Sequence, residues 1–599
     1  MSILSNRHRA PLLALALLTP AASRAADPAT EAAPAATPDP TAEVPLASDL
    51  PADSAPPVAA PTTNVTINLI NRLVQKGILT QGEAAEMVQQ AQADATAAAA
   101  RVDLPPIPPE PTPAEEMRVT YIPEVVRNQM RDEIKQDLMI QAREEAWSTK
   151  AEPSWTSKFR PFGDLRVRSE NTLFPDGNDT SGSFPNFNAI NTGSPYDETS
   201  ANYAPQYNVD QDRYRTRLRA RIGTEILLGD GFNGGLRLAT GDSNGPTSTN
   251  QSLGGSGGSF SKYSIWLDRA FLGYTFGPGD GDEATLFVGR FDNPFFTSEI
   301  QWDEDIGFDG LALRGTARLN DNLSTFLTAG YFPVYNTDFN FASNQPTKFD
   351  STDKWLTGVQ LGIDWKVAKD LTAKVGVAYY DFDSIAGELS SPFIPLSDKD
   401  AGDTDTTRPS FAQRGNSYMR LRNIDNTTFA NDYGNKYQYQ YYGLASEFRN
   451  LTLTGRLDYD HYDPIRLSLL GEVTKNLAFD SNDVAGRAVN NFGPGTNGAY
   501  DGGDMAWYLS FIIGNPALEK FGDWQASIGY RYVESDAVVD GFTDSDFGGG
   551  GTNVQGFTLG ANFALTKAVR CGLRWMSSDE IAGPPLASDV LMIDLNAKF

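Results

Sequence analysis

The chain has 599 residues, of which 40% are hydrophobic and 21% are charged, and its formal net charge is -27. Such an acidic chain is a poor candidate for binding nucleic acid, and a single cysteine excludes an intrachain disulfide or a cysteine-rich metal site. No apolar run reaches the roughly 18 residues of a membrane-spanning helix, which excludes a helical-bundle membrane protein. A membrane β-barrel remains open, because its strands alternate apolar and polar residues.

The N-terminus has the pattern of an export signal. In residues 1–26, two arginines precede the apolar stretch Leu12 to Leu18, and small residues follow at Ser23 and Ala25. This order predicts a cleaved secretory signal and not a buried helix. Residues 27–63 are rich in Ala, Pro and Thr and have few large apolar side chains, which predicts a disordered linker.

The next part of the chain predicts a helical arm in the periplasm. Residues 64–100 favour a helical, hairpin-like segment, and residues 101–113 a stiff proline-rich spacer. A further helix is expected within 114–150, where apolar residues recur four apart at Val126, Met130, Ile134 and Leu138. This single apolar face suits either a short helix packed under the next domain or a coiled coil that joins protomers.

From Phe162 to the last residue the apolar period changes to two, which is typical of β-strands. Connections between the expected strands alternate in length. They are tight at 320–322 and 367–370, and long at 171–210, 333–352, 381–438, 476–504 and 535–553. Short turns on one side and long loops on the other are typical of outer-membrane barrels.

Aromatic residues distinguish this pattern from that of a soluble β-sandwich. They recur at the ends of the expected strands, as in Trp355 and Trp365, where a membrane barrel has its interfacial girdles. The last strand alternates up to the terminal Phe599, which predicts an assembly signal for the outer membrane. The sequence therefore predicts an all-β transmembrane antiparallel β-barrel over 157–599, with the N-terminal helical extension in the periplasm.

A chain that enters from and returns to the periplasm needs an even number of strands. Two strands within 440–459 would give seventeen, so we interpret this region as one long strand with a bulge near Arg449 and Asn450. The prediction is sixteen strands, with eighteen as the alternative.

One expected strand carries five arginines on a single face, alternating with Tyr214, Thr216, Leu218, Ala220 and Ile222. Each arginine would cost about 2–4 kcal/mol against lipid at mid-bilayer, so this row is expected to face a water-filled lumen and to tune anion passage. The expected pore-lining residues are Arg213, Arg215, Arg217, Arg219 and Arg221, with Arg166, Arg168, Arg237, Arg269, Arg314 and Arg318 from neighbouring strands. A row of salt bridges to Asp164, Glu170 and Glu225 is the alternative, and both roles can hold together.

The third long connection, 291–309, combines apolar residues such as Phe295, Phe296 and Trp302 with several carboxylates. An outer loop this apolar would be unusual in water, so we expect it to fold into the barrel and to face the arginines across a constriction. Its acidic residues are Glu299, Asp303, Glu304, Asp305 and Asp309. An ordinary acidic surface loop is the alternative.

Other chemistry has little support. His461 is the one histidine after the signal and is expected in a periplasmic turn, which disfavours a hydrolase. The acidic run from Asp398 to Asp405 lacks the glycine and the final glutamate of an EF-hand, so it suggests an exposed loop, bridged by divalent ions to lipopolysaccharide phosphate as a further alternative. We expect no catalytic residues, no resident metal and no cofactor.

Several motifs in order resemble the proteobacterial "putative porin" family over about 119–599. They include FGDLRVRSE (162–170), DRYRTRLRARIG (212–223), GRFDNPFF (289–296) and FTDSDFGGGGTN (542–553). The resemblance implies a passive channel, commonly a homotrimer. The leading hypothesis is a porin for small hydrophilic solutes and ions, surrounded by outer-membrane lipid and lipopolysaccharide. The alternatives are a structural anchor, whose periplasmic arm holds peptidoglycan or a partner protein, and a substrate-specific anion channel.

Overall fold

The computed structural model describes residues 156–599, apart from 256, 338–341, 343, 426, 428–433 and 494–497. The predicted signal, linker, helical segments and spacer, all within residues 1–150, lie outside the described residues. None of the helices in the described ranges combines the length and the apolar character needed to cross a membrane.

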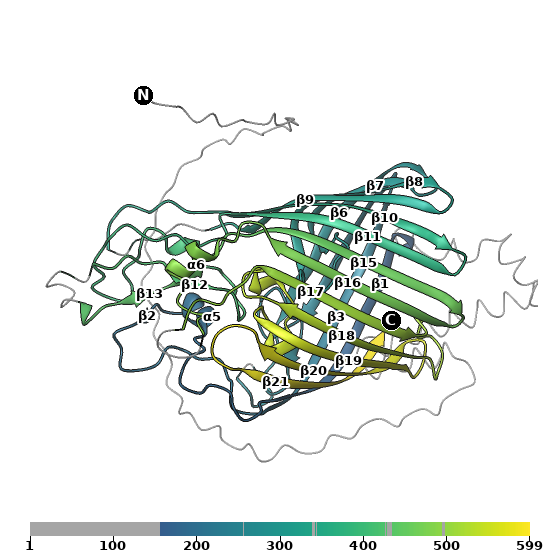
Figure 1. The fold of residues 1–599 in the computed structure, drawn as a ribbon. Coiled ribbons are helices and arrows are strands. Elements are labelled where there is room, and N and C mark those ends of the chain that lie inside the picture. Colours follow the sequence, from purple (N-terminus) through teal and green to yellow (C-terminus); the bar gives the residue numbers. More distant parts are fainter. Residues whose placement is uncertain are drawn as a thin grey trace, which may run out of the picture. The chain divides into compact units, whose positions relative to one another are not determined.

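Sixteen long strands form one closed antiparallel sheet, because each pairs with its chain neighbours and the last strand pairs back with the first (Figure 1). The seventeenth member of the sheet, β5 (Gln251–Ser252), has only two residues. The long strands are β1 (Phe159–Leu173), β3 (Arg213–Gly229), β4 (Phe232–Thr240), β6 (Ile265–Gly279), β7 (Asp282–Asp292), β8 (Gly307–Asn320), β9 (Leu323–Tyr335), β10 (Lys354–Ala368), β11 (Leu371–Asp383), β15 (Arg449–Tyr462), β16 (Ile465–Asn476), β17 (Met505–Gly514), β18 (Trp524–Val533), β19 (Val554–Ala564), β20 (Val569–Glu580) and β21 (Ala587–Lys598).

Short turns and long loops separate to opposite ends of the barrel, and the C-terminus lies at the turn end (Figure 1). Two-residue turns such as Asp230 and Gly231, both at positive φ, suit the twist of the flanking strands. We name the loops at the other end L1 (174–212), L2 (241–264), L3 (293–306), L4 (336–353), L5 (384–448), L6 (477–504), L7 (534–553) and L8 (581–586).

The loops contain the remaining short elements. Two of them pair across L1 and L5, and two more pair within L5. These elements are α5 (Phe187–Thr192), β2 (Tyr196–Asp197), η2 (Asp405–Thr407), β12 (Tyr418–Arg420), β13 (Tyr439–Gln440), β14 (Tyr442–Leu444), α6 (Ser481–Arg487), η4 (Asp540–Phe542) and η5 (Phe547–Gly549), while η1 (Thr156–Lys158) precedes β1.

The predicted single strand over 440–459 is wrong, although the count of sixteen is confirmed. The barrel strand begins at Arg449 and pairs with β11 without a break in register as far as Tyr459. Leu444 and Phe448 lie in L5 and are buried in a cluster that joins loop residues to inward-facing residues of the strands. The change of apolar face near 449 therefore marks the boundary between loop and strand and not a bulge.

The outward face of the barrel is apolar. Along β10, for example, Leu361 is 60% exposed whereas its neighbour Gln360 is fully buried inside. Aromatic pairs lie at both ends of this apolar band. Tyr331 and Trp355 stack with ring centroids 4.7 Å apart near the loops, and Phe232 lies 4.5 Å from Tyr274 near the turns. An exposed apolar band between two aromatic girdles is the surface that a bilayer requires.

The barrel closes where the chain ends. The Phe599 N–H donates to the Gly163 carbonyl at 3.0 Å, and the Gly163 N–H donates back at 2.9 Å. A Cβ atom on Gly163 would lie 2.5 Å from the Phe599 ring, so glycine leaves the space that the terminal aromatic ring occupies.

Candidate pore constriction

L3 crosses the inside of the barrel and is anchored to the wall through its backbone. The Gln360 amide on β10 accepts from the Phe296 N–H at 2.8 Å and donates to the Phe296 carbonyl at 2.7 Å. Glu472 on β16 accepts from the Ser298 N–H at 2.6 Å and from its hydroxyl at 2.9 Å. Because buried backbone groups need partners, these two side chains fix the course of the loop.

Aromatic packing supports the same course. Phe295 and Trp302 of L3 are buried against Tyr380 of β11, with ring centroids 5.1 and 5.4 Å away. Edge-to-face pairs of this kind add to the stabilisation from burial alone. The apolar part of L3 is thus accounted for by a packed layer inside the barrel.

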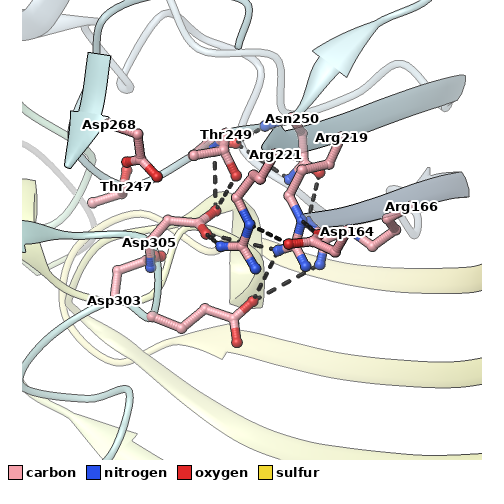
Figure 2. A network of polar contacts seen from close by, with 12 residues as sticks. Asp164, Arg166, Arg219, Arg221, Thr247, Thr249, Asn250, Asp268, Asp303 and Asp305 are labelled. Carbon is pink, nitrogen blue, oxygen red and sulfur yellow. Dashed lines mark hydrogen bonds and ion pairs between the residues drawn. The ribbon is translucent and has the colours of Figure 1, made fainter. Parts of the chain in front are cut away.

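The opposite end of L3 is held by arginines. Arg269 on β6 donates to the carbonyls of Asp305 and Ile306 at 3.2 and 3.0 Å. The Asp305 carboxylate accepts from Arg221 at 3.3 Å and from the N–H and hydroxyl of Thr249 at 3.1 Å each. Figure 2 shows Asp305 between Thr249 and the arginines of β3.

The arginine row of β3 points into the barrel and pairs with carboxylates on β1. Asp164 accepts from Arg219 at 3.0 Å and from Arg221 at 2.7 Å, so one carboxylate joins two arginines (Figure 2). Glu170 pairs in the same way with Arg215 and Arg217, the latter at 3.2 Å. The expected salt bridges to Asp164 and Glu170 are therefore present.

Arg168 and Arg269 lie in similar networks on neighbouring strands. Arg168 binds Asp594 of β21 through two nitrogens, at 2.7 and 3.0 Å, and Asp546 of L7 at 2.9 Å. Arg237 and Arg269 share Asp268 and Asp292. Planar guanidinium groups suit such multiple contacts. Arg166 donates to Asn250 of L2 at 2.6 Å.

Other expected residues lie outside this network. Arg213, Arg314 and Arg318 are exposed and form no ion pair with other described residues, and neither does Glu225. Asp309 was expected in the constriction loop but lies in β8, because that strand already begins at Gly307. Its partner is Arg290 of β7, at 2.6 Å.

The acidic residues of L3 differ in their partners. Glu304 lies 3.8 Å from Arg166 and 3.5 Å from Arg219, and Glu299 lies 3.5 Å from Arg531 of β18. Asp303 accepts from the backbone N–H groups of Asp305 and Ser545 and forms no ion pair with another described residue. Only part of the L3 carboxylate set thus faces the arginine row.

Water reaches two carboxylates of this region more than it reaches the arginines with which they pair. The side chain of Glu304 is 64% exposed, and that of Asp292 is 67% exposed. Arg166 and Arg219, by contrast, are 7% and 8% exposed. The arginines are therefore mainly internal partners, and much of the charge that solvent meets in this region is negative.

L7 also enters the barrel, which the sequence analysis missed. Asp544 pairs with Arg531 at 2.7 Å, and Asp546 pairs with Arg574 of β20 as well as with Arg168. The one signal in the sequence is the run of four glycines at 548–551, all at positive φ. A Cβ on Gly551 would lie 1.8 Å from the Arg414 carbonyl, so L7 packs closely on L5.

Buried polar contacts join L5 to L7. The Asn416 amide donates to the carbonyls of Ser535 and Val538 at 2.5 and 2.8 Å. The Tyr418 hydroxyl donates to the Asp540 carboxylate at 2.8 Å, and all of these groups are buried. The two loops thus form one packed unit above L3.

This unit predicts a pH effect on the outer loops. Burial raises the pKa of Asp540 from 3.8 to about 7, against the opposing effect of hydrogen bonds such as that from Tyr418. Because the pKa is higher in the folded loop, the stabilisation is complete below pH 3.8 and is lost as the pH rises through about 7. We expect faster limited proteolysis of L5 and L7 at pH 8 than at pH 6. Asp540→Asn should remove most of this difference, and an unchanged difference would contradict the assignment.

Two further expectations concern other sites. Asp405 of the acidic run is paired with Arg422 at 2.6 Å, and within the described ranges no group of three or more His, Cys, Asp or Glu side chains is arranged to hold a metal ion. His461 lies at the end of β15, next to the short turn, and its Nδ1 is 3.0 Å from Asp370.

Comparison with known proteins identifies the family. The chain matches the family described as "Putative porin" over residues 63–599 and belongs to it. The protein is therefore a porin-like outer-membrane β-barrel channel and not an enzyme. No curated protein matches the chain.

Solved structures of porins resemble the chain only distantly. Pseudomonas putida OprB at high pH is 11% identical, with 76% of this chain and 97% of that chain covered and a TM-score of 0.39. Salmonella typhi OmpF in complex with daunomycin is 11% identical (74% and 97% covered, TM-score 0.34). The anion-selective porin from Comamonas acidovorans is 12% identical (74% and 99% covered, TM-score 0.33). Likenesses this weak carry no argument about what crosses the present channel.

Proposed function

We propose that the protein allows passive diffusion of small hydrophilic solutes and ions across the outer membrane. The observation that carries this proposal is L3, which crosses a closed barrel and still leaves charged side chains such as Glu304 and Asp292 open to water. Charged rings at a narrow point are how many pores select by size and charge. The buried arginines hold L2, L3 and L7 in place around that point.

Recording in planar lipid bilayers tests this proposal. The purified, folded protein is added to a bilayer in 1 M KCl, and stable current steps are expected. A folded barrel that inserts and remains silent would contradict the proposal and would favour the structural anchor. An anion-specific channel would instead show saturable block of the current by its own solute, and the low exposure of the arginines is an argument against it.

The same proposal includes partners and assembly. We expect a homotrimer embedded in lipid and lipopolysaccharide, with the residues before the barrel in the periplasm, where they are available to peptidoglycan or a protein partner. Vibrio cholerae OmpT, which is 10% identical to this chain, has been solved in a trimer form. Phe599, which pairs with β1, is the proposed assembly signal.

A further inference from the structure

A small cleft lies beside L3, between it and the wall formed by β1 and β20. Its volume is about 20 Å³, close to the space that one water molecule needs. Arg166 and Arg574 line it together with Thr247, Asn250 and Ser545, and six carboxylates complete the lining: Glu299, Asp303, Glu304, Asp305, Asp544 and Asp546.

Five of the six carboxylates of this cleft fall into two groups. Asp305, Asp544 and Asp546 each have an arginine nitrogen within 3.3 Å, so their charge is largely matched. Glu299 and Glu304 are at least 3.5 Å from every arginine nitrogen with which they form an ion pair, beyond ordinary hydrogen-bond length. Their side chains are 40% and 64% exposed, so water and dissolved ions reach them.

The charge around the cleft is negative even when the buried partners are counted. The six lining carboxylates, with Asp164 and Asp594, outnumber by eight to seven the basic residues of this region: Arg166, Arg168, Arg219, Arg221, Arg531, Arg574 and Lys598. Burial raises the pKa of Asp303 well above its ordinary value.

We propose, on the basis of the diffusion channel inferred above, that ions pass L3 on the side of Glu299 and Glu304 and that these two carboxylates make the channel prefer cations to anions. This preference is opposite to the one that the arginine-rich sequence suggests, because most of these arginines form ion pairs with carboxylates inside the barrel. Arg318, an exposed basic residue, lies two residues before the end of β8 at the turn side of the barrel, and salt screens charges that are more than about 8 Å apart.

The test measures the reversal potential of the full-length protein in a KCl gradient across a planar bilayer at pH 8. We expect the reversal potential to lie between zero and the equilibrium potential of K⁺. In Glu304→Gln, the permeability ratio of K⁺ to Cl⁻ should fall about fourfold. At about 10 Å in water, one unit negative charge raises the local concentration of K⁺ about twofold and lowers that of Cl⁻ about twofold, and the two effects together give this factor. Glu299→Gln should act in the same direction.

Glu447→Gln is the matched control. Glu447 is 60% exposed and pairs with Arg449, but it is not among the residues that line the cleft. This variant should keep the ratio of the unmodified protein, and its current steps also show that neutralising one exposed glutamate leaves the barrel intact.

A second readout separates the two glutamates. The Glu299 side chain is 40% exposed, but the protein atoms packed around its carboxylate and the nearby Asp544 raise its pKa to about 7. Arg531 of β18 and Arg574 of β20 oppose this shift, and Glu304 of the same loop adds to it. The cation preference should therefore increase between pH 6 and pH 8 in the unmodified protein and in Glu304→Gln, and much less in Glu299→Gln. Shared changes in the outer loops affect both variants equally.

The outcomes distinguish the two proposals. A conducting channel whose reversal potential is zero, or lies towards the equilibrium potential of Cl⁻, overturns the cation preference but is consistent with the diffusion channel. A conducting, cation-preferring channel that both glutamine variants leave unchanged overturns the role of these carboxylates. A folded barrel without current overturns both proposals.

Discussion

Replacing residues 293–306 by a two-residue turn should raise the single-channel conductance several-fold. Asp292 and Gly307 are directly paired across β7 and β8, so a short hairpin can join the strands without disturbing the barrel ladder. The deletion removes Phe295 and Trp302 from the packed layer inside the barrel. Because that layer occupies space inside the barrel, its loss should leave a wider water-filled path. The measurement is the current step in 1 M KCl.

The control for this variant is an L3 that is loosened but not removed. Gln360→Ala with Glu472→Ala removes the anchors of L3 on β10 and β16, leaves the contacts of L3 with Arg269 and Arg221, and should give a smaller rise, with larger current fluctuations. Retention of the folded barrel is checked by its shift on unheated gels. If the deletion variant is folded and its conductance equals that of the unmodified protein, L3 does not limit the pore.

Arg168→Ala should cause the largest loss of stability among single replacements in the arginine network. The side chain is 2% exposed and joins Asp594 on β21 to Asp546 of L7. Removing one partner of a buried ion pair typically costs about 3–5 kcal/mol, because the remaining charge stays buried without compensation. We expect this decrease in the free energy of unfolding, measured by urea titration of the protein in lipid vesicles.

Two further variants make this test specific. Arg168→Lys keeps the charge but not the paired contact with Asp594, so an intermediate loss is expected. Arg213→Ala removes an exposed arginine of the same row that forms no ion pair with other described residues, and the unfolding midpoint should stay unchanged. Equal effects of Arg168→Ala and Arg213→Ala would show that burial and pairing are not what matters.

The barrel itself could be predicted from the sequence because its signals are local. The alternation along β3 and β10 and the tight turn at Asp321 and Asn322 follow from neighbouring residues. The even number of strands follows from a chain that enters and leaves the barrel on the same side of the membrane. The error at 440–459 has the opposite cause. Leu444 and Phe448 belong to a loop but are buried in a cluster inside the barrel, and a buried loop segment can have the same apolar composition as a strand.

The candidate site was harder to predict, because its pairs join residues far apart in the chain. The inward direction of Arg219 follows from its apolar neighbours, but its burial depends on Asp164 and on the tip of L3. Arg168 lies 426 positions from Asp594, and no local pattern marks that pair. Period-two alternation can say which side chains are inside a barrel, but not which of them meet water.

The pairing of the first strand with the last has a consequence for biogenesis. The ladder between β1 and β21 joins Asp164 to Lys598, so almost the whole barrel sequence separates the two partners. Until β21 pairs with it, β1 has one edge without a neighbour, and open edges of this kind invite pairing with other chains. A variant that lacks β21 should therefore be prone to aggregation or degradation, because its sheet cannot close.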